Sequence, residues 1–262
     1  HGFHTLNHQL EEERLRLAQK IVGNENPDIL LLTEACYSQP KAGGGGILMN
    51  YGQLFGFPHC IFAKRGDYEW GAALLSKYPI TKVENNGRGM RHHVSTNIDV
   101  KDIPLIFDIA HPHPTLTEDE KVGYFKELVL SGHAAPFILA GDFNAWSPQD
   151  KYDRDKLVKG FTGGENRSKK DAERIVDDAL RCKAVQTLLD EGLVASYRLV
   201  NPNGFAYTNP TQLAENENAR LRLDYIFCSP DIKVKDAYIV KNEDTEKASD
   251  HYPVVARIKL PK

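Results

Sequence analysis

The sequence lacks several features that would assign a protein to a class at once. It has four cysteines among 262 residues, and none are spaced as C-x-x-C, which excludes zinc-ribbon and thioredoxin-like sites. No apolar run approaches the roughly 20 residues that a transmembrane helix needs. The formal net charge of −3 argues against a protein that coats nucleic acid through bulk positive charge, although a local basic groove stays possible.

The composition is that of an ordinary folded protein. Hydrophobic residues make up 41% and charged residues 26% of the chain, so a sizeable core is expected. We see no internal repeat and no linker that would divide the chain, and we expect one domain over residues 1–262. A monomer in the cytoplasm is a working assumption that no feature of the sequence tests.

Short apolar runs alternate with amphipathic segments, which predicts one domain with more strands than helices. Helices are expected over residues 8–23, 117–131 and 171–191, the second of them marked by the capping-box pair Thr117 and Glu120. A polar stretch spans residues 145–170. Strands are expected over 29–32, 59–63, 71–76, 94–100, 104–110, 136–140, 193–199, 205–208, 222–229, 233–240 and 252–260.

Acidic and histidine side chains stand at the ends of several apolar strands. Glu34, His111 and Asp142 follow such runs, whereas Asp224 and the pair Asp250-His251 precede them. If the last strands run antiparallel to the earlier ones, these exits and entrances meet at one edge of the sheets. The sequence then predicts one cluster of four carboxylates and two histidines.

Such a cluster needs positive charge, because carboxylates packed together repel one another unless a cation joins them or some are protonated. Oxygen-rich sites suit hard cations such as Mg²⁺, Mn²⁺ or Ca²⁺. Each motif taken alone has an ordinary explanation: Gly141-Asp142-Phe143-Asn144 is also a good turn, and an isolated Asp-His pair is often incidental.

In their order and spacing, the motifs are much more specific. They are Glu34, Gly71–Ile80, His111, Gly141–Asn144, Leu223–Ile226 and Ser249–Pro253. Together they resemble the endonuclease/exonuclease/phosphatase superfamily over nearly the whole chain. The resemblance implies an α+β fold, a four-layered αββα sandwich with two mixed, mainly antiparallel sheets. It also implies a metal-dependent phosphoester hydrolase that uses Mg²⁺ or Mn²⁺.

The resemblance assigns the metal and the attacking water to four residues. Glu34 is the expected main metal ligand, and Asp250 is expected to bind the metal or approach it through water. Asp142 is the expected general base, and Asn144 is expected to position Asp142 and the phosphate. The family pattern also starts with a strand that ends in Asn, and we expect this strand to precede His1.

The phosphate is assigned to the histidines by the same resemblance. His251 is expected to contact the scissile phosphate while Asp224 orients its ring, and His111 is expected near the phosphate or the leaving oxygen. Trp146 lies two residues beyond Asn144, so we interpret it as a candidate for stacking on the substrate as well as for packing. Arg88, in a basic segment, is a second candidate substrate contact.

The substrate stays open at this level. A phosphodiesterase or nuclease is favoured, with nucleic acid a possible partner. The alternatives are a phosphatase or phospholipase C-type enzyme acting on a lipid or inositol phosphate, and a non-catalytic binding module on the same fold. Abasic-site repair is a weaker hypothesis, because Glu34 lacks the Gln before it and the Lys two residues after it that the exonuclease III-type pattern carries.

Overall fold

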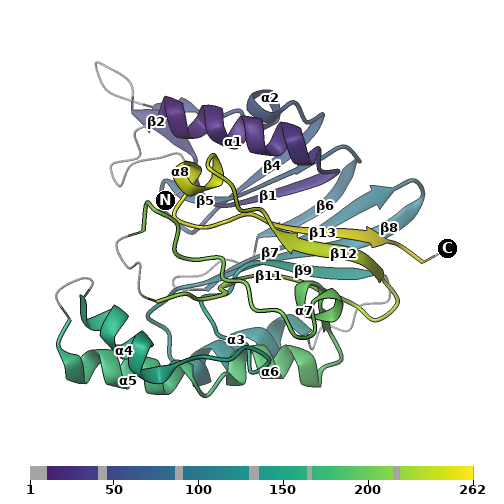
Figure 1. The fold of residues 1–262 in the computed structure, drawn as a ribbon. Coiled ribbons are helices and arrows are strands. Elements are labelled where there is room, and N and C mark those ends of the chain that lie inside the picture. The colour runs from purple at the N-terminus through teal and green to yellow at the C-terminus, as the bar shows by residue number, and fades with distance from the viewer. Residues whose placement is uncertain are drawn as a thin grey trace.

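The fold is a sandwich of two β-sheets between two layers of helices, seen in a computed structural model (Figure 1). The structure describes residues 11–40, 46–85, 91–129, 136–163, 167–214 and 219–261. Helices α1 and α2 cover one outer face, and α3, α5 and α6 cover the other. This arrangement confirms the predicted fold class.

Most strands pair with antiparallel neighbours. A three-stranded sheet has the order β1 (Ile29–Cys36), β5 (Trp70–Ser76), β4 (His59–Lys64). A six-stranded sheet has the order β10 (Val194–Ala195), β11 (Asp224–Cys228), β9 (Phe137–Asp142), β8 (Ile103–Pro112), β7 (Arg91–Val100), β6 (Ile80–Asn85). Two pairs complete the set: β12 (Lys233–Ile239) with β13 (Val254–Lys259), and β2 (Ser38–Pro40) with β3 (Gly46–Leu48). Among these pairs, only β8 and β9 run parallel.

The described helices are amphipathic or short and lie outside the sheets. Their bounds are α1 Glu12–Glu25, α2 Tyr51–Phe55, α3 Glu118–Val129, α4 Arg154–Gly163, α5 Lys169–Ala179, α6 Lys183–Asp190, α7 Ser196–Val200 and α8 Thr245–Ala248. Within the described ranges, no helix combines the length and the apolar character needed to cross a membrane.

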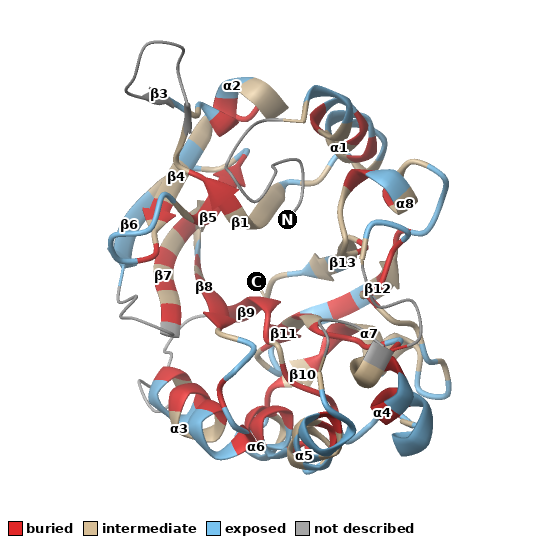
Figure 2. Ribbon diagram, turned by 90° about the vertical axis from the view of Figure 1, so that its left-hand side faces the viewer, coloured by how far each residue is buried: buried red, intermediate tan, exposed pale blue. Residues whose placement is uncertain are grey.

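The core has one apolar layer between the sheets and one under each outer helical layer, and buried residues line the strands along these layers (Figure 2). Leu74, Ile98 and Ile138 belong to the layer between the sheets. Phe125 on α3 and Phe227 on β11 belong to the layer under α3 and α6. Apolar residues on both faces of the strands explain why the strands read as dense hydrophobic runs in the sequence.

Four sequence predictions miss local structure. The strand expected over 205–208 is not a strand in the structure. The helix expected over 171–191 is two helices, α5 and α6, because Cys182 takes a left-handed conformation with φ +51° between them. The polar stretch 145–170 contains helix α4, which buries Leu157 and Val158. The strand expected over 193–199 is only the two-residue β10, followed by helix α7.

Candidate active site

Strand pairing brings the predicted catalytic residues to one edge of the sheets. Strands β8 and β9 run parallel, so His111 and Asp142 lie at neighbouring strand ends. Strand β11 runs antiparallel to β9, and Asp224 at its start pairs with Asp142 at the end of β9. Oxygen and nitrogen atoms of Asp142, Asp224 and His251 all lie within 4.8 Å of one another. The predicted meeting of these strand exits and entrances is therefore confirmed for these three residues.

Glu34 reaches the same edge from the three-stranded sheet. It lies in a bulge of β1, where the pairing with β5 shifts between Leu32 and Ala35, and its φ is +52°. Bulges re-aim side chains, and strained backbone of this kind often occurs at functional sites. The Nε2 atom of His111 lies 3.8 Å from Glu34 Oε1 and 3.9 Å from Asp142 Oδ2. His111 therefore lies between the acids of the two sheets.

The turn from Gly141 to Asn144 is tightly constrained. Gly141 has φ +145°, and a Cβ atom there would lie 2.1 Å from the carbonyl oxygen of Ala110. Asn144 has φ +46°, and its backbone N–H donates to Asp142 Oδ1 at 2.9 Å. Its side-chain amide donates to the carbonyl of Pro112 at 3.1 Å. These bonds hold Asp142 and Asn144 beside the end of β8.

A buried lysine that the sequence analysis overlooked supports this turn. Lys121 on α3 is only 5% exposed, and its Nζ donates to the carbonyl oxygen of Asn144 at 2.5 Å. The signal was present in the sequence, because Lys121 shares the helical stripe of Tyr124, Phe125 and Leu128, at spacings of three, four and seven residues. A lysine within an apolar stripe needs a buried acceptor.

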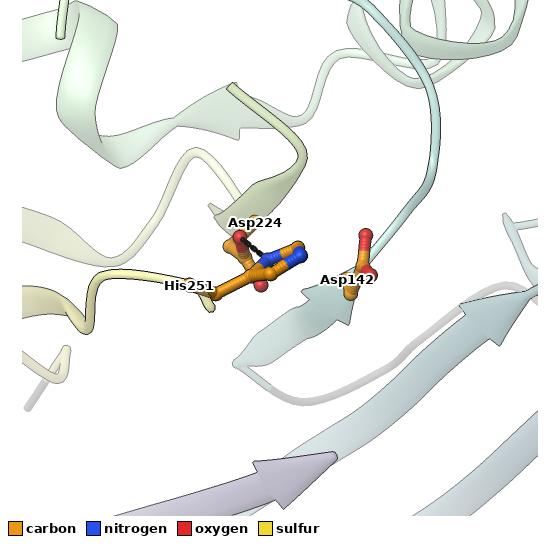
Figure 3. Close-up of side chains that lie close together, drawn as sticks. All are labelled: Asp142, Asp224 and His251. Carbon is orange, nitrogen blue, oxygen red and sulfur yellow. Dashed lines mark hydrogen bonds and ion pairs between the residues drawn. The ribbon is translucent and has the colours of Figure 1, made fainter. Parts of the chain in front are cut away.

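Asp224 and His251 form a hydrogen-bonded pair. His251 Nδ1 lies 2.7 Å from Asp224 Oδ2, and the far side of the ring points toward Asp142 (Figure 3). Burial alone would lower the pKa of His251, but the charge and hydrogen bond of Asp224 outweigh it, and the pKa rises to about 10. The ring is therefore protonated at neutral pH and presents a charged N–H donor.

The pKa values of Asp142 and His111 are also shifted, in directions that suit a phosphoester site. Burial, followed by the charge of Asp224, raises the pKa of Asp142 to about 7, although His251 opposes the shift. Burial lowers the pKa of His111 to about 4, despite the nearby Glu34 carboxylate. At neutral pH, His111 is a neutral polar group, and Asp142 titrates near the pH at which a general base works best.

A hard cation fits the carboxylates of this site better than it fits the cluster that includes the His251 ring. Asp142, Asp224 and His251 are close enough to share an ion, but a protonated His251 has no lone pair to offer. The oxygens of Glu34, Asp142 and Asp224 are the kind of donor that Mg²⁺ and Mn²⁺ prefer. Burial, and after it the charge of Asp224, raises the pKa of Asp142, and a cation beside these carboxylates would favour their ionised forms.

Asp250 stays a predicted metal ligand. Its charge helps to raise the pKa of His251, which places it in electrostatic range of the site. Its carbonyl oxygen accepts bonds from Thr211 N–H and from the Asn209 side chain, both at 3.2 Å. These bonds fix the backbone just before His251.

The two predicted substrate contacts have different outcomes. Trp146 is 3% exposed and packs against Tyr152 and Phe161, with ring centroids 5.1 and 6.3 Å away. This burial gives Trp146 a packing role and corrects the expectation that it stacks on substrate, because a ring covered on this scale presents no face to a ligand. Arg88 lies outside the described residues.

Comparison with known proteins identifies the family. The model of the endonuclease/exonuclease/phosphatase family matches residues 5–251, so the chain belongs to this family. Its enzymes hydrolyse phosphoesters, and dependence on divalent metals is typical of them. No individually curated protein sequence matches the chain closely enough to count as a relative.

Solved structures share the fold at low sequence identity. An endonuclease/exonuclease/phosphatase protein from Beutenbergia cavernae DSM 12333 is 18% identical with a TM-score of 0.60, and the match covers 95% of this chain and 66% of that one. A variant of the 3' phosphatase NExo from Neisseria, bound to a product DNA hairpin, is 22% identical with a TM-score of 0.59 and 94% of both chains covered. D. rerio TDP2 with a single-strand DNA product is 13% identical with a TM-score of 0.61, covering 95% and 92%.

Proposed function

We propose that the protein is a divalent-metal-dependent phosphodiesterase that attacks its substrate with an Asp142-activated water. The observation that carries this proposal is the position of a buried carboxylate, Asp142, beside the charged Asp224–His251 pair. One group accepts a proton and the other donates to an anion, and both lie at the same edge of the sheets. No nucleophilic serine or cysteine is needed for this chemistry.

Each residue has a defined task in the proposed reaction. Asp142 accepts the proton of the attacking water, a step worth typically about 10²- to 10⁴-fold. His251 donates its Nε2–H to a nonbridging phosphate oxygen, whose charge grows in the transition state, and Asp224 fixes the ring for this contact. Neutral His111 lies close enough to Asp142 to contact the phosphate or the leaving oxygen.

A divalent cation has a place on the Glu34 side of the site. Glu34 is the proposed main ligand, with its side chain 37% exposed, and Asp250 is the proposed second ligand. When bound, Mg²⁺ or Mn²⁺ would offset the charge of the phosphate and help to orient the displacement. This charge would also keep Asp142 ionised, which its surroundings alone disfavour at neutral pH.

Three other functions have weaker support than the phosphodiesterase. A phosphatase is the second candidate, supported by the structural likeness to a protein named as a 3' phosphatase. A phospholipase C-type activity on a lipid or inositol phosphate uses the same groups. A non-catalytic module is less favoured, because Glu34, His111, Asp142, Asn144, Asp224 and His251 are all retained.

The test is a substrate panel with and without metal. DNA, RNA, sphingomyelin and a phosphoinositide are each incubated with Mg²⁺, with Mn²⁺ and with excess chelator. We expect metal-dependent hydrolysis of at least one phosphodiester, which Asp142→Ala abolishes. Asp155→Ala is the matched control, because Asp155 is 96% exposed on α4. Undiminished hydrolysis in excess chelator, or full activity of Asp142→Ala, would refute the proposal.

A further inference from the structure

Two cationic side chains lie over the same aromatic ring, outside the candidate active site. Lys241 lies between β12 and α8 (Figure 1), and its Nζ atom is 3.0 Å from the centre of the Tyr207 ring and 4.4 Å from that of the Tyr252 ring. The guanidinium of Arg220 lies 4.9 Å from the centre of the Tyr207 ring. Both cationic residues are exposed, and the chemistry proposed above uses neither of them.

The positive charge of this cluster is not neutralised by a paired carboxylate. Within the described ranges, neither Arg220 nor Lys241 forms an ion pair. The charge of Glu246 acts on Lys241, but the Glu246 carboxylate already accepts hydrogen bonds from the Tyr252 hydroxyl and, at 3.1 Å, from the Gln212 N–H. Partial burial, followed by the charge of Arg220, lowers the pKa of Lys241 to about 8, although Glu246 opposes the shift. The two cations therefore repel each other, and a bound anion would offset this repulsion.

An open pocket beside Lys241 has room for such an anion. Its volume is about 560 Å³, and it is lined by Gln212, Lys241, Asn242, Glu243, Glu246 and Lys247. Small-molecule sites commonly have volumes of about 300–1,000 Å³. Lys247 adds a third cation to Lys241 and Arg220, whereas the acids of the pocket are Glu243 and Glu246. The pocket and its neighbour Arg220 therefore carry an excess of positive charge.

We propose that this pocket binds a small soluble molecule that carries a phosphate group, with Lys241 and Arg220 as the contacts to the phosphate. A phosphate ester offers negative charge and three acceptor oxygens, and lysine and arginine donate charged hydrogen bonds to such oxygens. The rings of Tyr207 and Tyr252 hold the Lys241 ammonium in place by cation–π attraction, so less side-chain freedom is lost on binding. A neutral or cationic ligand would leave the two cations unbalanced.

The pocket is separate from the candidate active site, although the two share a stretch of backbone. The Tyr252 side chain lies against Lys241, whereas the side chain of the preceding residue, His251, pairs with Asp224. The Tyr252 N–H donates to the Thr208 carbonyl at 2.7 Å, which fixes the backbone between the two sites. The inference therefore stands on its own contacts and does not depend on the proposed hydrolysis.

The first test uses pyridoxal 5'-phosphate as a phosphate-bearing probe, in the presence of EDTA. Its aldehyde condenses with a neutral lysine amine to an imine with loss of water, and sodium borohydride reduces the imine to a stable amine that peptide mass spectrometry locates. We expect Lys241 to be labelled about 5- to 30-fold faster than by pyridoxal, which lacks the phosphate, because one or two partly exposed charge pairs hold the probe. Arg220→Gln should lower this ratio about 5-fold.

The ratio of the two probes separates phosphate binding from the reactivity of the amine, which affects both probes alike. Lys126 on α3 is exposed and serves as the reference within the same protein, where both probes should react at similar rates. Arg174→Gln, at an exposed position of α5, is the matched control and should leave the ratio at Lys241 unchanged. Equal ratios at Lys241 and Lys126, or an unchanged ratio in Arg220→Gln, would overturn the inference.

The second test measures protection by a phosphate ester that does not react. Glycerol 3-phosphate should slow the labelling of Lys241 to the same degree in the wild-type protein and in His251→Gln, because His251 lies outside the pocket. Loss of protection in His251→Gln would show that the phosphate acts from the active site, which contradicts a separate pocket. Vesicles of phosphatidylcholine with phosphatidic acid test a lipid source of the phosphate. Protection by these vesicles alone, or by neither ligand, would refute a site for a small soluble phosphate ester.

Discussion

The Asp224–His251 pair gives the sharpest test of the site, through the substitution Asp224→Asn. The change keeps the size of the side chain and its ability to accept a bond from Nδ1, but it removes the charge. The contact is 2.7 Å long, and the side chains are only 19% and 25% exposed, so solvent screens the lost charge poorly. The pKa of His251 should fall, because burial lowers it and only the smaller effects of the Asp142 and Asp250 charges then raise it.

The size of the effect follows from the pKa. In the wild-type protein, the pKa of His251 rises from 6.5 to about 10. At about 1.4 kcal/mol per tenfold change in acidity, this corresponds to roughly 5 kcal/mol of preference for the charged ring, an upper limit for so closely coupled a pair. The folded-state pKa lies above the unfolded one, so this stabilisation is fully present below pH 6.5 and is lost as the pH rises through about 10.

Two measurements check the reasoning on Asp224→Asn. NMR titration of the histidine rings should place the wild-type His251 pKa far above 7 and the variant pKa clearly below the wild-type value. The kcat at pH 7.5 should fall about 10²- to 10³-fold, the typical cost of losing one charged donor at an oxyanion. Asp236→Asn, at a half-exposed acid that pairs with Arg257, should change neither quantity. A variant that keeps its kcat and a protonated His251 at neutral pH would refute the assigned role.

Two further substitutions test the turn that carries Asp142, the proposed general base. Gly141→Ala should lower the free energy of unfolding in urea by about 2–5 kcal/mol, because the added Cβ would lie 2.1 Å from the Ala110 carbonyl oxygen and φ is +145°. The control is Gly23→Ala in helix α1, where the added Cβ would meet no atom within 4 Å apart from its own helix backbone, and this change should be neutral or stabilising. Equal destabilisation by both substitutions would contradict the steric argument. Lys121→Met should lower kcat about 10- to 150-fold with little change in KM, because one charged hydrogen bond to the turn is lost. Lys126→Met, the same change at an exposed position of α3, should leave kcat unchanged. If Lys121→Met changed KM but not kcat, this result would argue against a positioning role for Lys121.

Much of the fold was predictable because periodicity and burial agree along the strands. The hairpin of β4 and β5 and the pairing of β7 with β8 lie where the apolar runs predict them. The positions at which helices end were harder to predict. Nothing in the residues 180–182 is a strong helix breaker, yet Cys182 takes a left-handed conformation and ends the run that was read as one helix. Tertiary packing overrode local propensity there.

The candidate site was predictable where it lies on strand ends and unpredictable where it depends on distant support. Asp142 and Asp224 meet because β9 and β11 are antiparallel neighbours, which the strand-end pattern anticipates. The bulge that aims Glu34 leaves no mark in the sequence, because a bulge is defined by the partner strand. Trp146 shows the opposite error: its distance of two residues from Asn144 suggested substrate contact, but helix α4, which was not predicted, covers it.

A buried ion triad of Asp150, Arg198 and Arg222 holds the candidate site in place through residues outside the sequence motifs. Asp150 lies beyond the Gly141–Asn144 turn, and its fully buried carboxylate accepts from Arg222 Nε at 2.9 Å and from Arg198 on α7. Arg222 is two residues before Asp224, and its guanidinium also lies against the ring of Tyr225. Burying such charges gains little net stability, because desolvation offsets the attraction, but a carboxylate held by two guanidiniums has one low-energy arrangement. The triad therefore ties the loop after Asp142, the proposed general base, to the strand that carries Asp224, so Asp142 and the Asp224–His251 pair keep their relative positions.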